Sequence, residues 1–125
     1  MNKVVITGNL GKDPEQRNTS TGKTVTNFSV AVNRRWVNSE TGEVVEETTW
    51  FRVTCWGRLA ETTNQYLKKG SKVLVEGRIK VSAYMGNEGE ARASLEVTAQ
   101  SVEFLDPAPY RAGRDDSPED QELPF

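Results

Sequence analysis

Long runs of residues that alternate between apolar and polar side chains constrain the fold of this chain most. The clearest run spans residues 24–36, where Phe28, Val30 and Val32 share one side and the positions between them are polar or small. A period of two residues is typical of β-strands that bury one face. Further runs of this kind cover residues 3–8, 44–57, 71–84 and 91–105, with a turn at residues 38–43. The chain is therefore expected to be mainly β-sheet.

One segment has helical spacing instead, residues 59–69, which end in two lysines before Gly70. Residues 11–23 are polar and contain several turn formers, so a loop is expected there. Three strands, a short helix and two strands match an all-β, five-stranded Greek-key barrel of the OB type, with the helix between strands 3 and 4. A six-stranded sandwich is the alternative, but it does not account for the helix in that position.

Finer features of the last two strands also follow from the alternation. Val81, Ala83 and Ala93 are expected to point inward, and a change of phase near Ser101 predicts a β-bulge or a strand end.

The chain is expected to form an OB domain over residues 1–105 and a disordered acidic tail over residues 106–125.

Composition narrows the class of function. Residues 1–105 carry 14 basic and 12 acidic side chains, whereas residues 106–125 carry 2 and 6. There is no histidine, one cysteine and no apolar run near the ~20 residues of a membrane span. With no nucleophile paired to a base, no metal-ligand cluster and no glycine-rich phosphate loop, we expect a cytoplasmic binding protein without cofactor or metal, and not an enzyme.

Residues 50–58 carry an unusual polar face. Alternation puts Trp50, Arg52 and Trp56 on one side of the strand and Phe51, Val53 and Cys55 on the other. Aromatic rings interleaved with cations suit a single-stranded nucleic acid, because bases stack on the rings while phosphates pair with the cations. The alternative is that both indoles pack under a loop or against another subunit. Arg78 and Tyr84 repeat the pattern on the run at residues 71–84.

The end of the acidic tail is also distinctive. Its last six residues are Asp-Gln-Glu-Leu-Pro-Phe, so the chain finishes on a large aromatic side chain beside its terminal carboxylate. A plain solubilising tail does not require this ending. A peptide that inserts Phe125 into an apolar pocket while its carboxylate meets an arginine does, and this docking role is favoured.

Several segments, in this order, resemble those of the bacterial single-stranded DNA-binding proteins. They are Asn2-Lys3-Val4, residues 8–15 (GNLGKDPE), residues 27–31 (NFSVA), residues 50–53 (WFRV), residues 56–61 (WGRLAE), residues 66–71 (YLKKGS), residues 75–78 (VEGR) and the acidic Leu-Pro-Phe end. The resemblance implies an OB fold, a homotetramer and a cytoplasmic, nucleoid-associated location. It also implies protection of single-stranded DNA in replication, recombination and repair. An OB adaptor that mainly binds RNA or proteins is the alternative function.

Matching positions also imply residue roles. Bases would stack on Trp36, Trp50, Trp56 and Tyr84. Phosphates would be neutralised by Arg34, Arg35, Arg52, Arg58, Lys69, Lys72 and Arg78. Replication and repair proteins would dock on Asp120, Glu122, Leu123, Pro124 and Phe125. Two departures are a short linker at residues 107–118 and a tip that reads Glu-Leu where Asp and Ile are commoner in the family.

Overall fold

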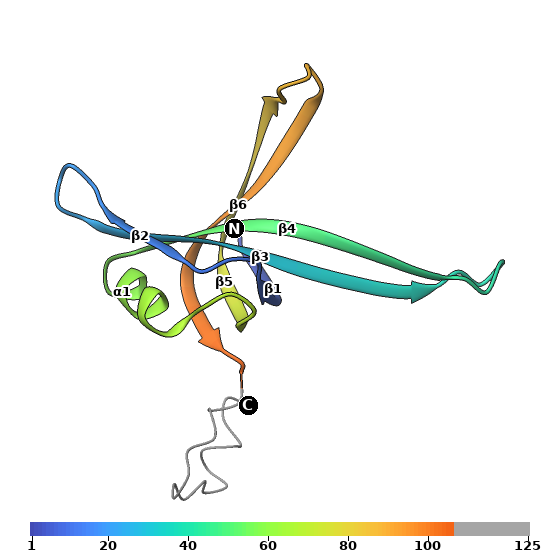
Figure 1. Cartoon of the computed structure of the whole chain (residues 1–125), viewed down its shortest axis with the longest axis horizontal. Helices are drawn as coiled ribbons and strands as arrows, with labels where there is room; N and C mark the ends of the chain where they lie inside the picture. The colour runs from blue at the N-terminus through green and yellow to red at the C-terminus, as the bar shows by residue number, and fades with distance from the viewer. Residues whose placement is uncertain (107–125) are drawn as a thin grey trace, which may run out of the picture.

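Residues 1–106, the part of the chain that this computed structural model describes, form six strands and one helix (Figure 1). In chain order they are β1 (Val4–Leu10), β2 (Glu15–Asn18), β3 (Thr24–Val37), β4 (Val44–Trp56), α1 (Gly57–Tyr66), β5 (Lys72–Met85) and β6 (Ala91–Phe104).

The five long strands close into a barrel. Their order is β1-β5-β6-β4-β3, and pairing of β1 with β3 at Asn9↔Ala31 and Leu10↔Val30 completes the ring. The β4–β6 pair is parallel and the other pairs are antiparallel. With α1 between the third and fourth long strands, the predicted OB fold is confirmed and the sandwich is wrong.

The barrel interior is built from the predicted apolar positions. Val30, Val53, Val75 and Val97 are almost fully buried, and Phe28 lies beside them. The helix covers one end of the barrel with Ala60 and Thr63, and Leu67 directly after it is also buried there. The buried Thr26 hydroxyl donates to the carbonyl oxygen of Ala60 at 2.6 Å, which ties the helix to β3 without leaving a buried hydroxyl unpaired.

Two hairpins, β3–β4 and β5–β6, extend well beyond the barrel (Figure 1). The prediction that Val81, Ala83 and Ala93 point inward is wrong, since all three are exposed and Val81 is 61% accessible. The pairing explains this result. Strand β1 pairs with β5 only as far as Gly77 and β4 pairs with β6 only as far as Leu95, so beyond those points no other described strand pairs with the hairpin.

Element boundaries differ from the prediction in two places. Strand β2 lies inside the segment expected to be a loop; all four of its residues are exposed, so it has no apolar alternation to reveal it. The helix spans residues 57–66 rather than 59–69, because Leu67 turns to an extended conformation and buries its side chain in the core. The predicted bulge is confirmed, since Glu76 pairs with Ser101 but Gly77 pairs with Ala99.

Candidate nucleic-acid interface

Strand pairing aligns the predicted cationic side chains across one outer face of the barrel. Ser29 of β3 pairs with Arg52 of β4, Arg52 pairs with Glu96 of β6, and Glu96 pairs with Lys80 of β5. Paired residues in a sheet share a face, so these four side chains form one row across four strands. We call this surface the β3–β4–β6–β5 face.

A second row lies beside the first. It runs from Asn27 through Thr54 and Thr98 to Arg78. The register therefore brings Arg52 and Arg78, predicted from separate stretches of sequence, onto the same face. Lys80 joins them and carries the same charge, although it was not among the predicted phosphate contacts.

Three of the four predicted stacking rings share the parity of this face. Trp50 and Trp56 flank Arg52 on β4, and Tyr84 lies further along β5 from Arg78 and Lys80. Trp50 is 53% exposed, Trp56 45% and Tyr84 51%. Rings of this size normally bury most of their surface, so this degree of exposure favours a binding role over a structural one.

The backbone at Gly11 supports the ring of Trp50. A β-carbon on Gly11 would lie 2.6 Å from Cζ3 and 2.7 Å from Cη2 of the indole. Opposite Trp50 on β3 is the small residue Ala31. The indole therefore packs against bare backbone next to a small neighbour, which limits the positions that the ring can take.

The cluster Arg34-Arg35-Trp36 is divided between two faces of the β3–β4 hairpin. The pairing is continuous from Val25↔Trp56 to Val37↔Val44, so Trp36 and Arg34 lie on the opposite face from Trp50. The Arg34 guanidinium carbon is 4.6 Å from the centroid of the Trp36 ring, a cation–π contact. Arg35 lies on the Trp50 face, where its Nε is 3.8 Å from Glu46.

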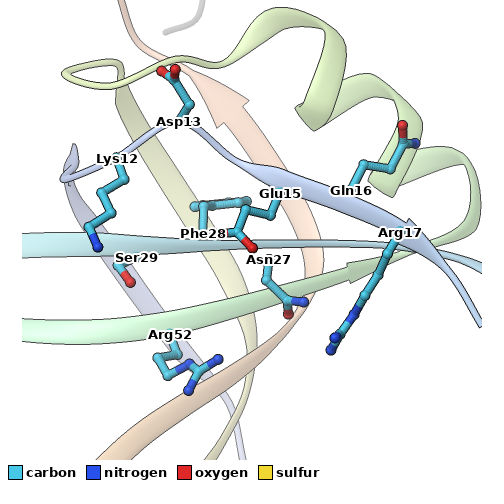
Figure 2. A pocket seen from close by; sticks show the side chains of 9 residues that line it. All are labelled: Lys12, Asp13, Glu15, Gln16, Arg17, Asn27, Phe28, Ser29 and Arg52. Atoms are coloured by element: carbon cyan, nitrogen blue, oxygen red, sulfur yellow. The ribbon is translucent and has the colours of Figure 1, made fainter.

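A groove of about 350 Å³ crosses the face at β2 and β3. Figure 2 shows Lys12 from the β1–β2 loop and Arg52 from β4 with Ser29 between them, and Arg17 of β2 towards the other end. Sequence reasoning missed Lys12 and Arg17 because they lie in the segment expected to be a loop. Their charge was visible in the sequence, but only the pairing of β2 with β3 places Arg17 beside the face, and only the folded β1–β2 loop brings Lys12 to the groove.

The remaining predicted cations lie away from the two rows. Arg58 is the second residue of α1, close in sequence to Trp56. The backbone N–H of Lys69 donates to Asp13 at 2.8 Å, and that of Lys72 donates to Asp106 at 3.0 Å. Lys72 is six residues from Arg78 on β5, roughly 20 Å along the strand. The structure thus separates the predicted phosphate contacts into a central group and a peripheral group.

Ion pairing leaves most of these cations available to a ligand. Within residues 1–106 the salt bridges are Lys3–Glu76, Arg35–Glu46 and Arg92–Glu90. The other six predicted phosphate contacts therefore have no carboxylate within 4.0 Å in that part of the chain. A cation without an internal partner can pair with a phosphate without first breaking a salt bridge.

The single cysteine is structural. Burial raises the pKa of the Cys55 thiol to about 11, although a hydrogen bond with the Thr63 side chain opposes the shift. Residues 1–106 bring together no group of three side chains suited to a metal ion. No helix in the described part of the chain has the length and apolar character needed to cross a membrane.

A closed β-barrel with exposed rings between unpaired cations defines an OB-fold protein with a surface suited to single-stranded nucleic acid. The chain belongs to the single-strand binding protein family, whose family model matches residues 1–105.

Curated relatives and solved structures agree with this assignment. The chain is 43% identical over 105 residues to the single-stranded DNA-binding proteins of Neisseria meningitidis serogroup A / serotype 4A (strain DSM 15465 / Z2491) and serogroup B (strain ATCC BAA-335 / MC58). Each match covers 84% of this chain but only 60% of the relative.

Two solved structures are similar at 26% identity. The small single-stranded DNA-binding protein of Streptomyces coelicolor has a TM-score of 0.70 and is matched over 82% of this chain and 92% of that chain. A Plasmodium falciparum SSB in complex with ssDNA has a TM-score of 0.72, with 85% and 96% covered.

Proposed function

We propose that this protein binds and protects single-stranded DNA without sequence specificity, by stacking bases on exposed rings and neutralising phosphates. The observation that carries the proposal is the alignment of Trp50, Trp56 and Tyr84 with unpaired arginines on the β3–β4–β6–β5 face. The similarity to an SSB seen with single-stranded DNA supports it. The role is one of binding, and no catalytic step is proposed.

The strand would cross the face along the rows that the register defines. Arg52 and Arg78 at its centre would contact phosphates between stacked bases. Trp36 would bind the strand from the other side of the β3–β4 hairpin, with Arg34 holding its ring. DNA that contacts both Trp50 and Trp36 must therefore pass around an edge of this hairpin. Arg35, Arg58, Lys69 and Lys72 would contact the strand further out.

Tryptophan fluorescence tests the proposal directly. Titration with oligo-dT should quench the emission strongly, less so at higher salt, while a duplex of equal length should quench it little. Trp50 and Trp56 lie on the proposed face and Trp36 lies on the other side of the β3–β4 hairpin; all three are at least partly exposed, so the signal reports stacking itself. An absence of quenching by the single strand, or equal quenching by the duplex, would overturn the proposal.

Variants locate the binding surface. Trp50→Ala and Trp56→Ala should each weaken binding by the ~1–3 kcal/mol typical of a base–ring stack, with little change in thermal stability. Tyr66→Ala is the matched control, because Tyr66 is a 62% exposed ring on α1, near Phe104 and off the proposed face. If Tyr66→Ala weakens binding as much as the tryptophan variants do, the face is wrongly placed.

We also propose that the last residues recruit proteins of DNA replication, recombination and repair. The proposal rests on the acidic Leu-Pro-Phe ending and on family membership. Asp120, Glu122, Leu123, Pro124 and Phe125 lie outside the described residues. Deletion of residues 120–125 should abolish co-purification of such proteins while oligo-dT binding persists. Retention of the same partners would contradict a docking role.

Action on bacterial DNA would place the protein in the cytoplasm at the nucleoid.

Assembly into a homotetramer is proposed on the same basis of family membership. An exposed apolar side chain on the outer face of β1, Val5 at 54%, fits burial against another copy. Light scattering coupled to gel filtration should give four times the mass of one chain. A monomeric mass at micromolar concentration would contradict it.

A further inference from the structure

A hollow beside Trp56 offers more than a ring for stacking. It has a volume of about 430 Å³ and is lined by Trp56 of β4 together with Arg17, Asn18, Thr19, Val25, Asn27 and Thr54. Val25 is buried and gives the hollow an apolar floor. Among residues 1–106 no carboxylate lines the hollow, so its polar character there comes from amides, hydroxyls and one guanidinium.

A threonine hydroxyl orients the Asn27 amide in this hollow. Thr54 Oγ1 donates to Oδ1 of Asn27 at 2.9 Å, across the β3–β4 pair. Thr24 Oγ1 donates to Oδ1 of Asn18 at 3.2 Å, but this pair has the opposite parity to Arg17 and Trp56, so both side chains lie on the other face of the sheet. An amide whose oxygen already accepts a hydrogen bond presents its NH₂ group to a ligand.

The hollow therefore presents mainly hydrogen-bond donors. Within residues 1–106 no side-chain or backbone acceptor takes the NH₂ of Asn27, and Arg17 has no carboxylate within 4.0 Å. Figure 2 shows Asn27 and Arg17 extending to the same side of their strands. Two donor side chains from two paired strands, those of Arg17 and Asn27, thus border the exposed ring of Trp56.

We propose that this hollow reads the edge of the base stacked on Trp56. It favours thymine and guanine, which carry a carbonyl oxygen at C4 of the pyrimidine or C6 of the purine, over cytosine and adenine, which carry an amine at that position. The inference rests on the proposed binding of single-stranded DNA. A carbonyl oxygen accepts a hydrogen bond from the amide NH₂ or the guanidinium. An amine at that position would instead place its own N–H donors against the N–H donors of the protein, and no hydrogen bond would form. Binding remains broadly sequence-tolerant, with a bias at this one subsite.

A base suits the hollow better than a phosphate does. The apolar floor at Val25 and the flat indole match an aromatic ring, whereas a phosphate gains nothing from either surface. Partial burial also keeps the Asn27–Thr54 hydrogen bond from exchanging readily with water. A second pair, Thr48 Oγ1 to Asn33 Oδ1 at 2.8 Å, has the same chemistry but is exposed and lies outside the hollow.

Thr54→Val tests the idea, and Thr48→Val is its matched control. Each variant replaces a hydroxyl by a methyl group of similar size on the same strand. In Thr54→Val the Asn27 amide is released to present its oxygen as readily as its nitrogen. The probes are oligomers of dT and of 5-methyl-dC of equal length, whose bases share the ring size and the methyl group but differ in carbonyl against amine.

The measured quantity is the ratio of the two dissociation constants at fixed salt and neutral pH. The wild-type protein should prefer dT by roughly 2- to 10-fold, the range of one discriminating hydrogen bond. Thr54→Val should reduce that preference at least twofold, while Thr48→Val leaves it unchanged. Unfolding curves for both variants establish that the fold is retained.

Three results would overturn the inference. Equal binding of both oligomers by the wild type means that the hollow does not read the base. A fall in affinity that is the same for both oligomers in Thr54→Val assigns the hollow to phosphate. Unchanged affinities for both oligomers in Thr54→Val mean that the Asn27–Thr54 pair does not set the preference. In each case the tryptophans still report binding of single strands, so the proposed function itself stands. It fails separately if wild-type emission responds to neither oligomer.

Discussion

Replacement of Gly11 by alanine should weaken DNA binding without weakening the fold. The added β-carbon would lie 2.6 Å from Cζ3 and 2.7 Å from Cη2 of Trp50. Carbon atoms in contact are about 3.5–4.0 Å apart, so the ring must move by about 1 Å. Because the indole is half exposed, it can swing outward rather than push the backbone.

The energetic consequences for stability and for binding differ. Gly11 is not among the glycines with positive φ, so alanine fits its backbone and lowers the entropy of the unfolded chain. The free energy of unfolding should therefore stay within about 1 kcal/mol of wild type. A full base–ring stack is worth ~1–3 kcal/mol, and a displaced ring should lose about 1 kcal/mol of it, near fivefold in affinity.

A double-mutant cycle with Trp50→Phe supplies the assay. Phenylalanine lacks the two indole atoms that alanine would strike, so Gly11→Ala should add almost nothing in the Trp50→Phe background. Oligo-dT affinity would be measured for all four proteins, and urea unfolding would give their stabilities. An equal loss of affinity from Gly11→Ala in both backgrounds would refute the reasoning, because the effect would not pass through the ring of Trp50.

Three further predictions concern the fold, the thiol and the phosphates. Gly77→Ala should destabilise the barrel by about 1–3 kcal/mol in urea unfolding, because the added carbon meets the Thr98 carbonyl oxygen on β6; an unchanged midpoint would contradict this close approach. Burial raises the pKa of the Cys55 thiol from 9.0 to about 11. The stability that the neutral thiol contributes is therefore complete below pH 9 and is lost as the pH rises through about 11. When unfolding is compared at pH 8 and pH 10.5, the wild-type protein should show this loss and Cys55→Ala should not. Arg52→Gln should lower the magnitude of the slope of log K against log salt for oligo-dT by about 0.7. Arg35→Gln should change that slope less, because the Arg35 guanidinium already pairs with Glu46 in the wild-type protein. Equal changes in the two variants would argue against a central role for Arg52.

Alternation along each strand was sufficient to predict much of this molecule. It identified the long strands and the inward positions of β3. It also indicated the bulge near Ser101 and the exposure of Trp50 and Trp56. This works because the two sides of a strand lie in different environments, and successive side chains alternate between apolar and polar according to which side is buried. The roles of the individual rings and cations in binding DNA remain predictions.

Tertiary structure decided everything that depends on which strand lies next to which. Only the β4–β6 and β5–β6 pairs align Arg52 with Lys80, and only the β2–β3 and β3–β4 pairs bring Arg17 beside Trp56. Only the continuous β3–β4 register shows that Trp36 and Trp50 lie on opposite faces, and only the end of the β1 and β4 pairing leaves Val81 exposed. The alternation along a strand predicts that one of its faces is buried. It does not predict which element covers that face or where that element ends. Those contacts join residues far apart in the sequence and form only when the sheet closes.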